Sequence, residues 1–124
     1  MLAIIRDEPM AATCLQTLLN SQENRISAAS YLAASIVADR LPESPGAATF
    51  DDLIEQLSII VEPLTTHQAA IAREAYGRFG KGVGHPARLN FGDCFAYALT
   101  TDLDEPLLFV GQDFIHTDVR RVLD

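Results

Sequence analysis

The sequence has few cysteines, no long apolar run and no leader-like start. Its cysteines, Cys14 and Cys94, lie far apart in a chain of 124 residues, which argues against a disulfide framework or a zinc site. No apolar run approaches the ~20 residues that a membrane-spanning helix needs. Residues 1–9 lack the basic segment of a signal peptide. We therefore expect a cytoplasmic protein with reduced thiols and no membrane contact.

Basic residues are scarce relative to acidic ones. Nine Lys and Arg stand against seventeen Asp and Glu, which gives a net charge of −8. This charge argues against a broad surface that neutralises nucleic-acid phosphates. It leaves a nuclease open, because a carboxylate cluster loaded with a divalent metal ion carries its own positive charge. It also leaves open a basic protein partner.

Short apolar runs alternate with amphipathic stretches along the chain. Helices are predicted over 10–20, 27–40, 49–57, 66–79 and 91–99, and strands over 25–27, 59–61 and 107–110. Ser27, Thr49 and Thr66 are the predicted helix caps. Such alternation is typical of parallel strands joined by helical crossovers, with both faces of the sheet covered. The sequence predicts one α/β domain over residues 1–124, without repeats or internal boundaries.

Two aspartates flank the last predicted helix and strand. Asp113 follows the strand over 107–110, where functional groups of open α/β sheets gather. Asp93 opens the helix that leads back into that strand, so the two carboxylates can lie together. A few carboxylates plus waters hold Mg²⁺ or Mn²⁺, which stabilises a phosphoryl transition state. From spacing alone the alternatives stay open, with Asp93 as a capping partner of Asn90 and Asp113 as a turn residue.

Other signals of chemistry are missing from the sequence. His67, His85 and His116 show no metal-ligand spacing, and no serine or cysteine has an identifiable catalytic partner. The glycine-rich segment 77–84 matches neither phosphate-binding fingerprint, because no helix with Lys-Ser/Thr opens behind it. Local chemistry alone therefore leaves the function open.

Three segments resemble a known family. They are 25–32, 82–94 with its Leu-Asn-Phe-Gly-Asp-Cys string, and 106–114 with its Gly-x-Asp-Phe string. In order and spacing they resemble the PIN-domain ribonucleases of the VapC toxin type, over essentially the whole chain. The resemblance implies an α/β/α sandwich with a central parallel sheet, RNA cleavage that depends on Mg²⁺ or Mn²⁺, and a VapB antitoxin as partner. It assigns Asp93 and Asp113 to the acidic site, and Asp118 is a predicted auxiliary metal ligand.

Two departures from the family pattern concern its acidic site. The family begins with a short strand that ends in Asp. Residues 2–9 match the family segment that comes after this strand, so we expect the strand and its Asp to be absent. Ala33 stands where the family's Glu follows Tyr-Leu. A divalent ion held only by Asp93 and Asp113 is bound weakly and poorly oriented. The expected function is a VapC-type endoribonuclease with impaired activity, and the alternative is an inactive PIN domain that acts as a protein-binding module.

The densest basic group of the chain precedes Asp93. It comprises Arg78, Lys81, His85 and Arg88, in and around a predicted glycine-rich loop. We expect Arg78, Lys81 and Arg88 to guide the RNA backbone by salt-dependent contacts. A solvated loop without a ligand is the alternative.

The predicted helices over 10–20 and 27–40 carry more apolar side chains than one small sheet can bury. A groove between them, lined by Leu15, Leu18 and Ile36, is the predicted seat of an amphipathic antitoxin helix. The alternative assigns these residues to the core or to a homodimer interface. A homodimer is expected in either case.

Overall fold

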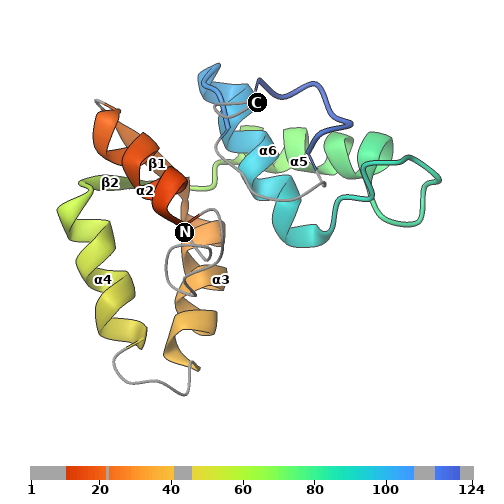
Figure 1. Ribbon diagram of the computed structural model, residues 1–124. Helices are drawn as coiled ribbons and strands as arrows, with labels where there is room; N and C mark the ends of the chain where they lie inside the picture. The colour runs from red at the N-terminus through yellow and green to blue at the C-terminus, as the bar shows by residue number, and fades with distance from the viewer. Residues whose placement is uncertain (1–10, 22, 41–45, 108–113, 121–124) are drawn as a thin grey trace. The chain divides into compact units, whose positions relative to one another are not determined.

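The computed structural model describes residues 11–21, 23–40, 46–107 and 114–120. Its helices and strands are α2 (Ala11–Asn20), β1 (Asn24–Ser27), α3 (Ala28–Asp39), α4 (Gly46–Gln56), β2 (Ile59–Glu62), α5 (Thr66–Phe79) and α6 (Phe91–Leu103) (Figure 1). They divide between two compact units, Met1–Glu62 and Pro63–Asp124. None of the helices in the described ranges combines the length with the apolar character that spanning a membrane requires.

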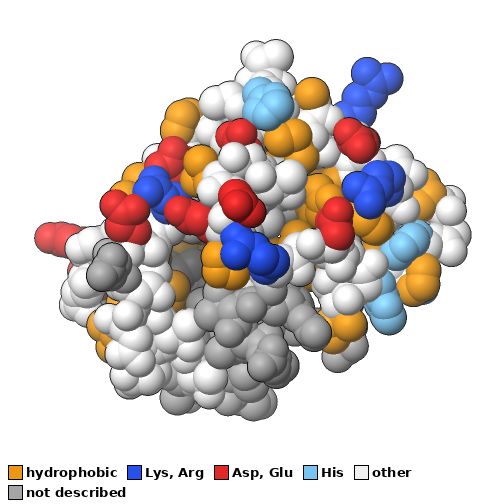
Figure 2. Space-filling model, turned by 90° about the horizontal axis from the view of Figure 1, so that it is seen from above, with side chains coloured by type: hydrophobic (Ala, Val, Ile, Leu, Met, Phe, Trp, Pro, Cys, Tyr) orange, Lys and Arg blue, Asp and Glu red, His pale blue; other side chains and the backbone are white. Residues whose placement is uncertain are grey.

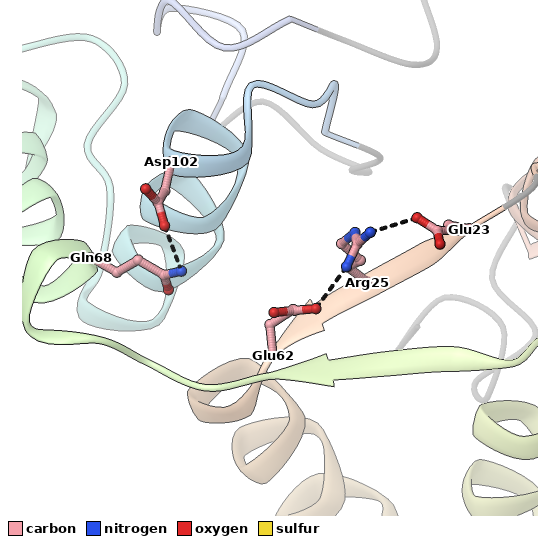
Figure 3. Close-up of polar contacts among 5 residues, drawn as sticks. All are labelled: Glu23, Arg25, Glu62, Gln68 and Asp102. Atoms are coloured by element: carbon pink, nitrogen blue, oxygen red, sulfur yellow. Dashed lines mark hydrogen bonds and ion pairs between the residues drawn. The ribbon is translucent and has the colours of Figure 1, made fainter.

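The first unit contains a parallel pair of short strands. β1 and β2 pair with Arg25 opposite Ile60, and the chain between them forms α3 and α4. This connection is the helical crossover that parallel strands require. Arg25 bridges two carboxylates, with Nη1 2.7 Å from Oε1 of Glu62 and Nη2 2.5 Å from Oε2 of Glu23 (Figure 3). Both strands lie where the sequence predicts them, and the α/β class is confirmed.

Helix α3 begins where Ser27 caps it. The Ser27 hydroxyl accepts a hydrogen bond from the backbone N–H of Ala29 at 3.3 Å, as the sequence predicts. Ala34 and Ala38 are the buried residues of α3, and they form one cluster with the buried Phe50 of α4. The core of this unit is therefore a large ring against small side chains.

Helix α4 begins earlier than the sequence predicts. The prediction that Thr49 caps this helix is wrong, because α4 starts at Gly46 and Thr49 lies in its interior. Ala47 and Ala48 are the strongest helix formers, so the helix extends through them toward its N-terminus. At the other end Ser58 adopts the left-handed conformation at φ 50°, which is typical of a residue that terminates a helix.

The second unit contains an α5–α6 hairpin with one apolar core. Its buried members are Ala72, Ala75, Phe79, Ala87, Leu89, Cys94, Tyr97, Ala98 and Phe114. At one end the N–H of Lys81 donates to the carbonyl of Leu89 at 2.7 Å, and the N–H of Leu89 donates to the carbonyl of Phe79 at 2.8 Å. At the other end Nε2 of Gln68 donates to Oδ2 of Asp102 at 3.1 Å (Figure 3). The two helices therefore run antiparallel, with the start of α6 beside the end of α5.

The bounds of α5 are as predicted, but its capping residue differs. Thr65, and not Thr66, is the cap, because its hydroxyl accepts the backbone N–H three residues on at 3.1 Å. The helix runs to Phe79, as predicted, so Gly77 and Arg78 lie in its last turn and the glycine-rich loop begins after them. One glycine costs a helix only about 1 kcal/mol, and the burial of Phe79 outweighs that cost.

The strand predicted over 107–110 lies mostly outside the described residues. Leu107 is described, and its N–H donates to the carbonyl of Arg120 at 2.7 Å. The helix predicted near the start of the chain is confirmed over 11–20. The single domain over residues 1–124 stays a prediction.

Candidate active site

Asp93 is fixed at the start of α6 by a reciprocal pair of hydrogen bonds. The backbone N–H of Asp93 donates to Oδ1 of Asn90 at 2.9 Å, and the backbone N–H of Asn90 donates to Oδ2 of Asp93 at 3.0 Å. This capping box satisfies N–H groups that a helix start leaves without partners. The positive end of the helix dipole favours the ionised carboxylate there. A carboxylate has about four acceptor positions, so capping and metal binding are compatible in one residue.

The chain neighbours of Asp93 and Asp113 enter the same core. Cys94 follows Asp93 and Phe114 follows Asp113, and both belong to the buried cluster of the α5–α6 hairpin. Asp113 itself lies outside the described residues. The nearness of the two carboxylates therefore stays a prediction.

Cys94 is a core residue without the properties of a nucleophile. Its Sγ donates to the carbonyl of Asn90 at 3.4 Å. Burial, and after it the negative charge of Asp93, raises the pKa of the Cys94 thiol. The thiol therefore stays protonated at neutral pH, as expected for a reduced, packed cysteine.

Asp118 is engaged by a tyrosine and an arginine. The Tyr97 hydroxyl donates to Oδ1 of Asp118 at 2.6 Å, and Nη2 of Arg78 lies 3.6 Å from Oδ2. Burial, followed by the hydrogen bond to Asp118, raises the pKa of Tyr97 to about 12. Tyr97 was not among the predicted site residues, and its place one helical turn after Asp93 is the signal that points to it. A metal ion at Asp118 would have to compete with Arg78.

Within the described ranges, no group of three or more His, Cys, Asp or Glu side chains could hold a metal ion. Asp93 and Asp118 are described, with Asp93 bonded to Asn90 and Asp118 to Tyr97. A capped, ionised carboxylate suits a hard divalent cation. A metal ion at Asp93 therefore requires ligands from outside these ranges, and Asp113 is the predicted one.

The predicted RNA-binding residues lie in and beside the loop of the α5–α6 hairpin. Lys81 and Arg88 are exposed in this loop. Arg88 has a left-handed backbone at φ 53°, and both of its neighbours are buried, so its side chain is excluded from the core. Arg78 lies on α5, with its guanidinium 4.5 Å from the centre of the Phe79 ring. The His85 ring packs edge-on against Phe79, with ring centres 4.9 Å apart, and so helps to order the loop.

Charges of both signs are interspersed on the face that Figure 2 draws. Lys and Arg side chains lie there among Asp and Glu side chains, with apolar side chains between them. Ion pairs such as Arg120–Asp104 at 3.1 Å and Arg78–Asp118 neutralise part of the basic charge. RNA contacts are therefore expected at a few local cations and not across a broad basic field.

The predicted site residues of the first unit lie on α2 and α3. Ala33 is exposed on α3. Leu15 and Leu18 lie on α2, and Leu18 is half-buried. Leu32 and Ile36 of α3 are 60% and 44% exposed. Helix α3 therefore presents apolar side chains outside the core of its own unit.

Comparison with protein families matches residues 1–120 to the PIN domain. The chain is 51% identical over 123 residues to a Mycobacterium bovis protein named VapC ribonuclease Mb0625. The matched region covers 99% of this chain and 92% of that relative. It is 40% identical over 118 residues to Ribonuclease VapC42 of Mycobacterium tuberculosis, covering 95% of this chain and 90% of that relative. It is 39% identical over 122 residues to Ribonuclease VapC of Mycolicibacterium smegmatis, covering 98% and 94%. The chain belongs to the PIN-domain family, in its VapC ribonuclease branch.

Proposed function

We propose that the chain is a VapC-type endoribonuclease that cleaves RNA with Mg²⁺ or Mn²⁺ and is neutralised by a VapB-type antitoxin. Identity of 51% over 99% of the chain to a VapC ribonuclease carries this proposal. The α/β fold and the capped carboxylate at the start of α6 support it.

Asp93 and Asp113 are the proposed catalytic carboxylates and metal ligands. The capping box keeps Asp93 oriented, and the shared core beneath Cys94 and Phe114 supports a common position for both acids. When bound, a divalent ion supplies a Lewis acid for the phosphate and lowers the pKa of a water molecule. Asp118 stays a proposed auxiliary ligand.

RNA cleavage by the purified chain tests this function. Cleavage is measured with Mg²⁺ or Mn²⁺, with and without EDTA, beside the Asp93→Asn variant, which keeps an oxygen for the capping bond. Because Ala33 leaves the acidic site incomplete, we expect weak cleavage that depends on the metal and is lost in Asp93→Asn. Cleavage that survives both EDTA and Asp93→Asn would contradict the proposal.

A protein-binding module without catalysis is the second candidate function. The exposed Ala33 favours it, because the position that matches the family's glutamate carries no carboxylate. The same assay separates the two candidates. No cleavage by the chain or by its Ala33→Glu variant favours the binding module.

Arg78, Lys81 and Arg88 are proposed to contact the RNA backbone. Lys81→Gln and Arg88→Gln are the clean tests, because Arg78→Gln also releases Asp118. Each clean variant should weaken binding at every sequence and lower the slope of log affinity against log salt by about one. Unchanged slopes in both variants would leave these residues as a solvated loop.

The proposed antitoxin contact uses Leu15, Leu18 and Ile36 on α2 and α3. The exposure of Ile36, and of Leu32 on the same helix, supports it, because an apolar helix face is a common seat for an amphipathic segment. A homodimer is proposed as well, and the oligomeric state of the free chain tests it.

A further inference from the structure

The first turn of α6 carries an aromatic ring that the core does not use. Phe91 is 76% exposed, more than the other large apolar side chains described as exposed. Helical spacing groups Phe91 with Cys94 and Ala98 in one apolar stripe, yet those two residues are buried at 4% and 0%. Phe91 is therefore available for a contact outside the core.

The Phe91 ring is supported from one side. Phe95, one turn further along α6, meets it edge to face, with ring centres 4.8 Å apart and an angle of 86° between the ring planes. Aromatic pairs favour this geometry because the positive edge of one ring meets the negative face of the other. The support limits the movement of Phe91, while the high exposure leaves ring surface open to a ligand.

Groups suited to an RNA chain lie close to Phe91 in the sequence. Asp93 is in the same first turn of α6, although residues two apart leave a helix on different sides. Arg88 and Lys81 lie in the loop that leads into Phe91, and the bond from Lys81 N–H to Leu89 holds that loop against the helix start. Aromatic rings that stack bases, beside cations that meet phosphates, are how proteins bind single-stranded nucleic acid.

We propose that Phe91 is a base-stacking residue, which receives an unpaired RNA base that flanks the phosphate at Asp93. This inference rests on the proposed ribonuclease function and names a contact of that site with a base. Every base has an aromatic face, so Phe91 adds affinity for unstacked bases of any type.

Fluorescence of a single-stranded RNA oligonucleotide that contains 2-aminopurine tests the proposal, because stacking quenches this base. Every chain in the test also carries Asp93→Asn, which keeps the RNA intact. Phe91→Leu removes the aromatic face, and Phe91→Tyr keeps one. Leu64→Ala is the matched control, since Leu64 is 38% exposed and precedes α5 at the opposite end of the hairpin.

Quenching is expected in the reference chain, in Phe91→Tyr and in Leu64→Ala. Phe91→Leu should lose the quench and bind about 5- to 100-fold more weakly. Retained quench and affinity in Phe91→Leu would overturn the stacking proposal and leave the ribonuclease proposal standing on its cleavage assay.

Sedimentation of the same variants separates an RNA contact from a protein contact. Loss of RNA affinity together with loss of a dimer in Phe91→Leu assigns Phe91 to a contact between copies and overturns the proposal. If the reference chain binds no RNA and the unmodified chain cleaves none, the stacking residue and the proposed function fall together.

Discussion

The two units of the chain use their acids and their apolar residues in different ways. In the second unit, Phe79 and Tyr97 are buried between α5 and α6. Two of its acids accept hydrogen bonds from defined partners. Asp93 accepts the N–H of its helix cap, and Asp118 accepts the hydroxyl of Tyr97. The carboxylates there are oriented by a firm core, which is what a metal site requires.

In the described part of the first unit the bonded acids are Glu23 and Glu62, which pair with Arg25 and not with a helix cap or a tyrosine. The core of this unit is Phe50 against alanines, and α3 leaves Leu32 and Ile36 exposed. Ala33, the predicted counterpart of the family's glutamate, is exposed on α3. The proposed ligands Asp93 and Asp113 belong to the second unit, and the proposed apolar contact surface belongs to the first.

The largest expected effect is on stability. Phe79→Ala removes a side chain that is 6% exposed, and it should lower the free energy of unfolding by about 3–5 kcal/mol. Leu32→Ala, at 60% exposure, should cost less than about 0.5 kcal/mol. Urea unfolding of both variants measures the difference. A cost above about 2 kcal/mol for Leu32→Ala would show that its side chain is packed in the folded protein.

The next effect concerns catalysis. Ala33→Glu should raise metal-dependent RNA cleavage by about 100-fold, because it returns the carboxylate that the family resemblance places at this position, and misplacement of a reacting group costs about that factor. Glutamate is a good helix former and position 33 is exposed, so the fold should be unchanged. Ala33→Gln, which has the same length without charge, is the control. Equal rates in both variants would contradict the assignment of this position to the acidic site.

A smaller effect is expected on antitoxin binding. Ile36→Asp places a charge in the proposed apolar contact and should weaken the complex with a VapB-type partner by about 30-fold, the equivalent of about 2 kcal/mol. Leu64→Asp is the control, because Leu64 has similar exposure in the second unit. Calorimetric titration measures both affinities. Equal losses in the two variants would remove the distinction between the units as contact surfaces.

The smallest effect concerns the bond between Tyr97 and Asp118. Tyr97→Phe should lower the free energy of unfolding by about 1 kcal/mol at neutral pH. The pKa of Tyr97 is about 12 in the folded state against an ordinary 10.0, so its contribution to stability is complete below pH 10 and is lost as the pH rises from 10 to 12. The difference between the two proteins should therefore shrink over that range. A constant difference from pH 8 to pH 12 would contradict the cause given for the raised pKa.

Local patterns in the sequence predicted what short-range chemistry decides. The caps at Ser27 and Asn90 depend on hydrogen bonds within three residues, and both are confirmed. The prediction of a cap at Thr49 was wrong, because the alanines before it extend the helix past the capping pattern. The apolar periodicity grouped Phe91 with buried residues, although Phe91 is exposed. Periodicity shows which residues share a helix face, and not how much of that face the core covers.

Contacts between distant residues were beyond the reach of such patterns. Tyr97 and Asp118 are 21 residues apart, and the sequence shows no spacing that joins them. The cation–π contact of Arg78 with Phe79 also depends on α5 continuing through Gly77, which propensity alone disfavours. The packing of the α5–α6 core determines both the Tyr97–Asp118 hydrogen bond and the Arg78–Phe79 contact.

Metal binding tests the central claim most directly, namely that Asp93 and Asp113 hold the divalent ion. Mn²⁺ binding is measured by the loss of the free-ion signal in electron paramagnetic resonance, for the unmodified chain and for Asp93→Asn, Asp113→Asn and Asp104→Asn. Asp104 is the control, because its side chain is 94% exposed and its φ of 53° suits asparagine. We predict that Asp93→Asn and Asp113→Asn each weaken Mn²⁺ binding by about tenfold or more and that Asp104→Asn leaves it unchanged. Equal Mn²⁺ affinity in all four proteins would contradict the account.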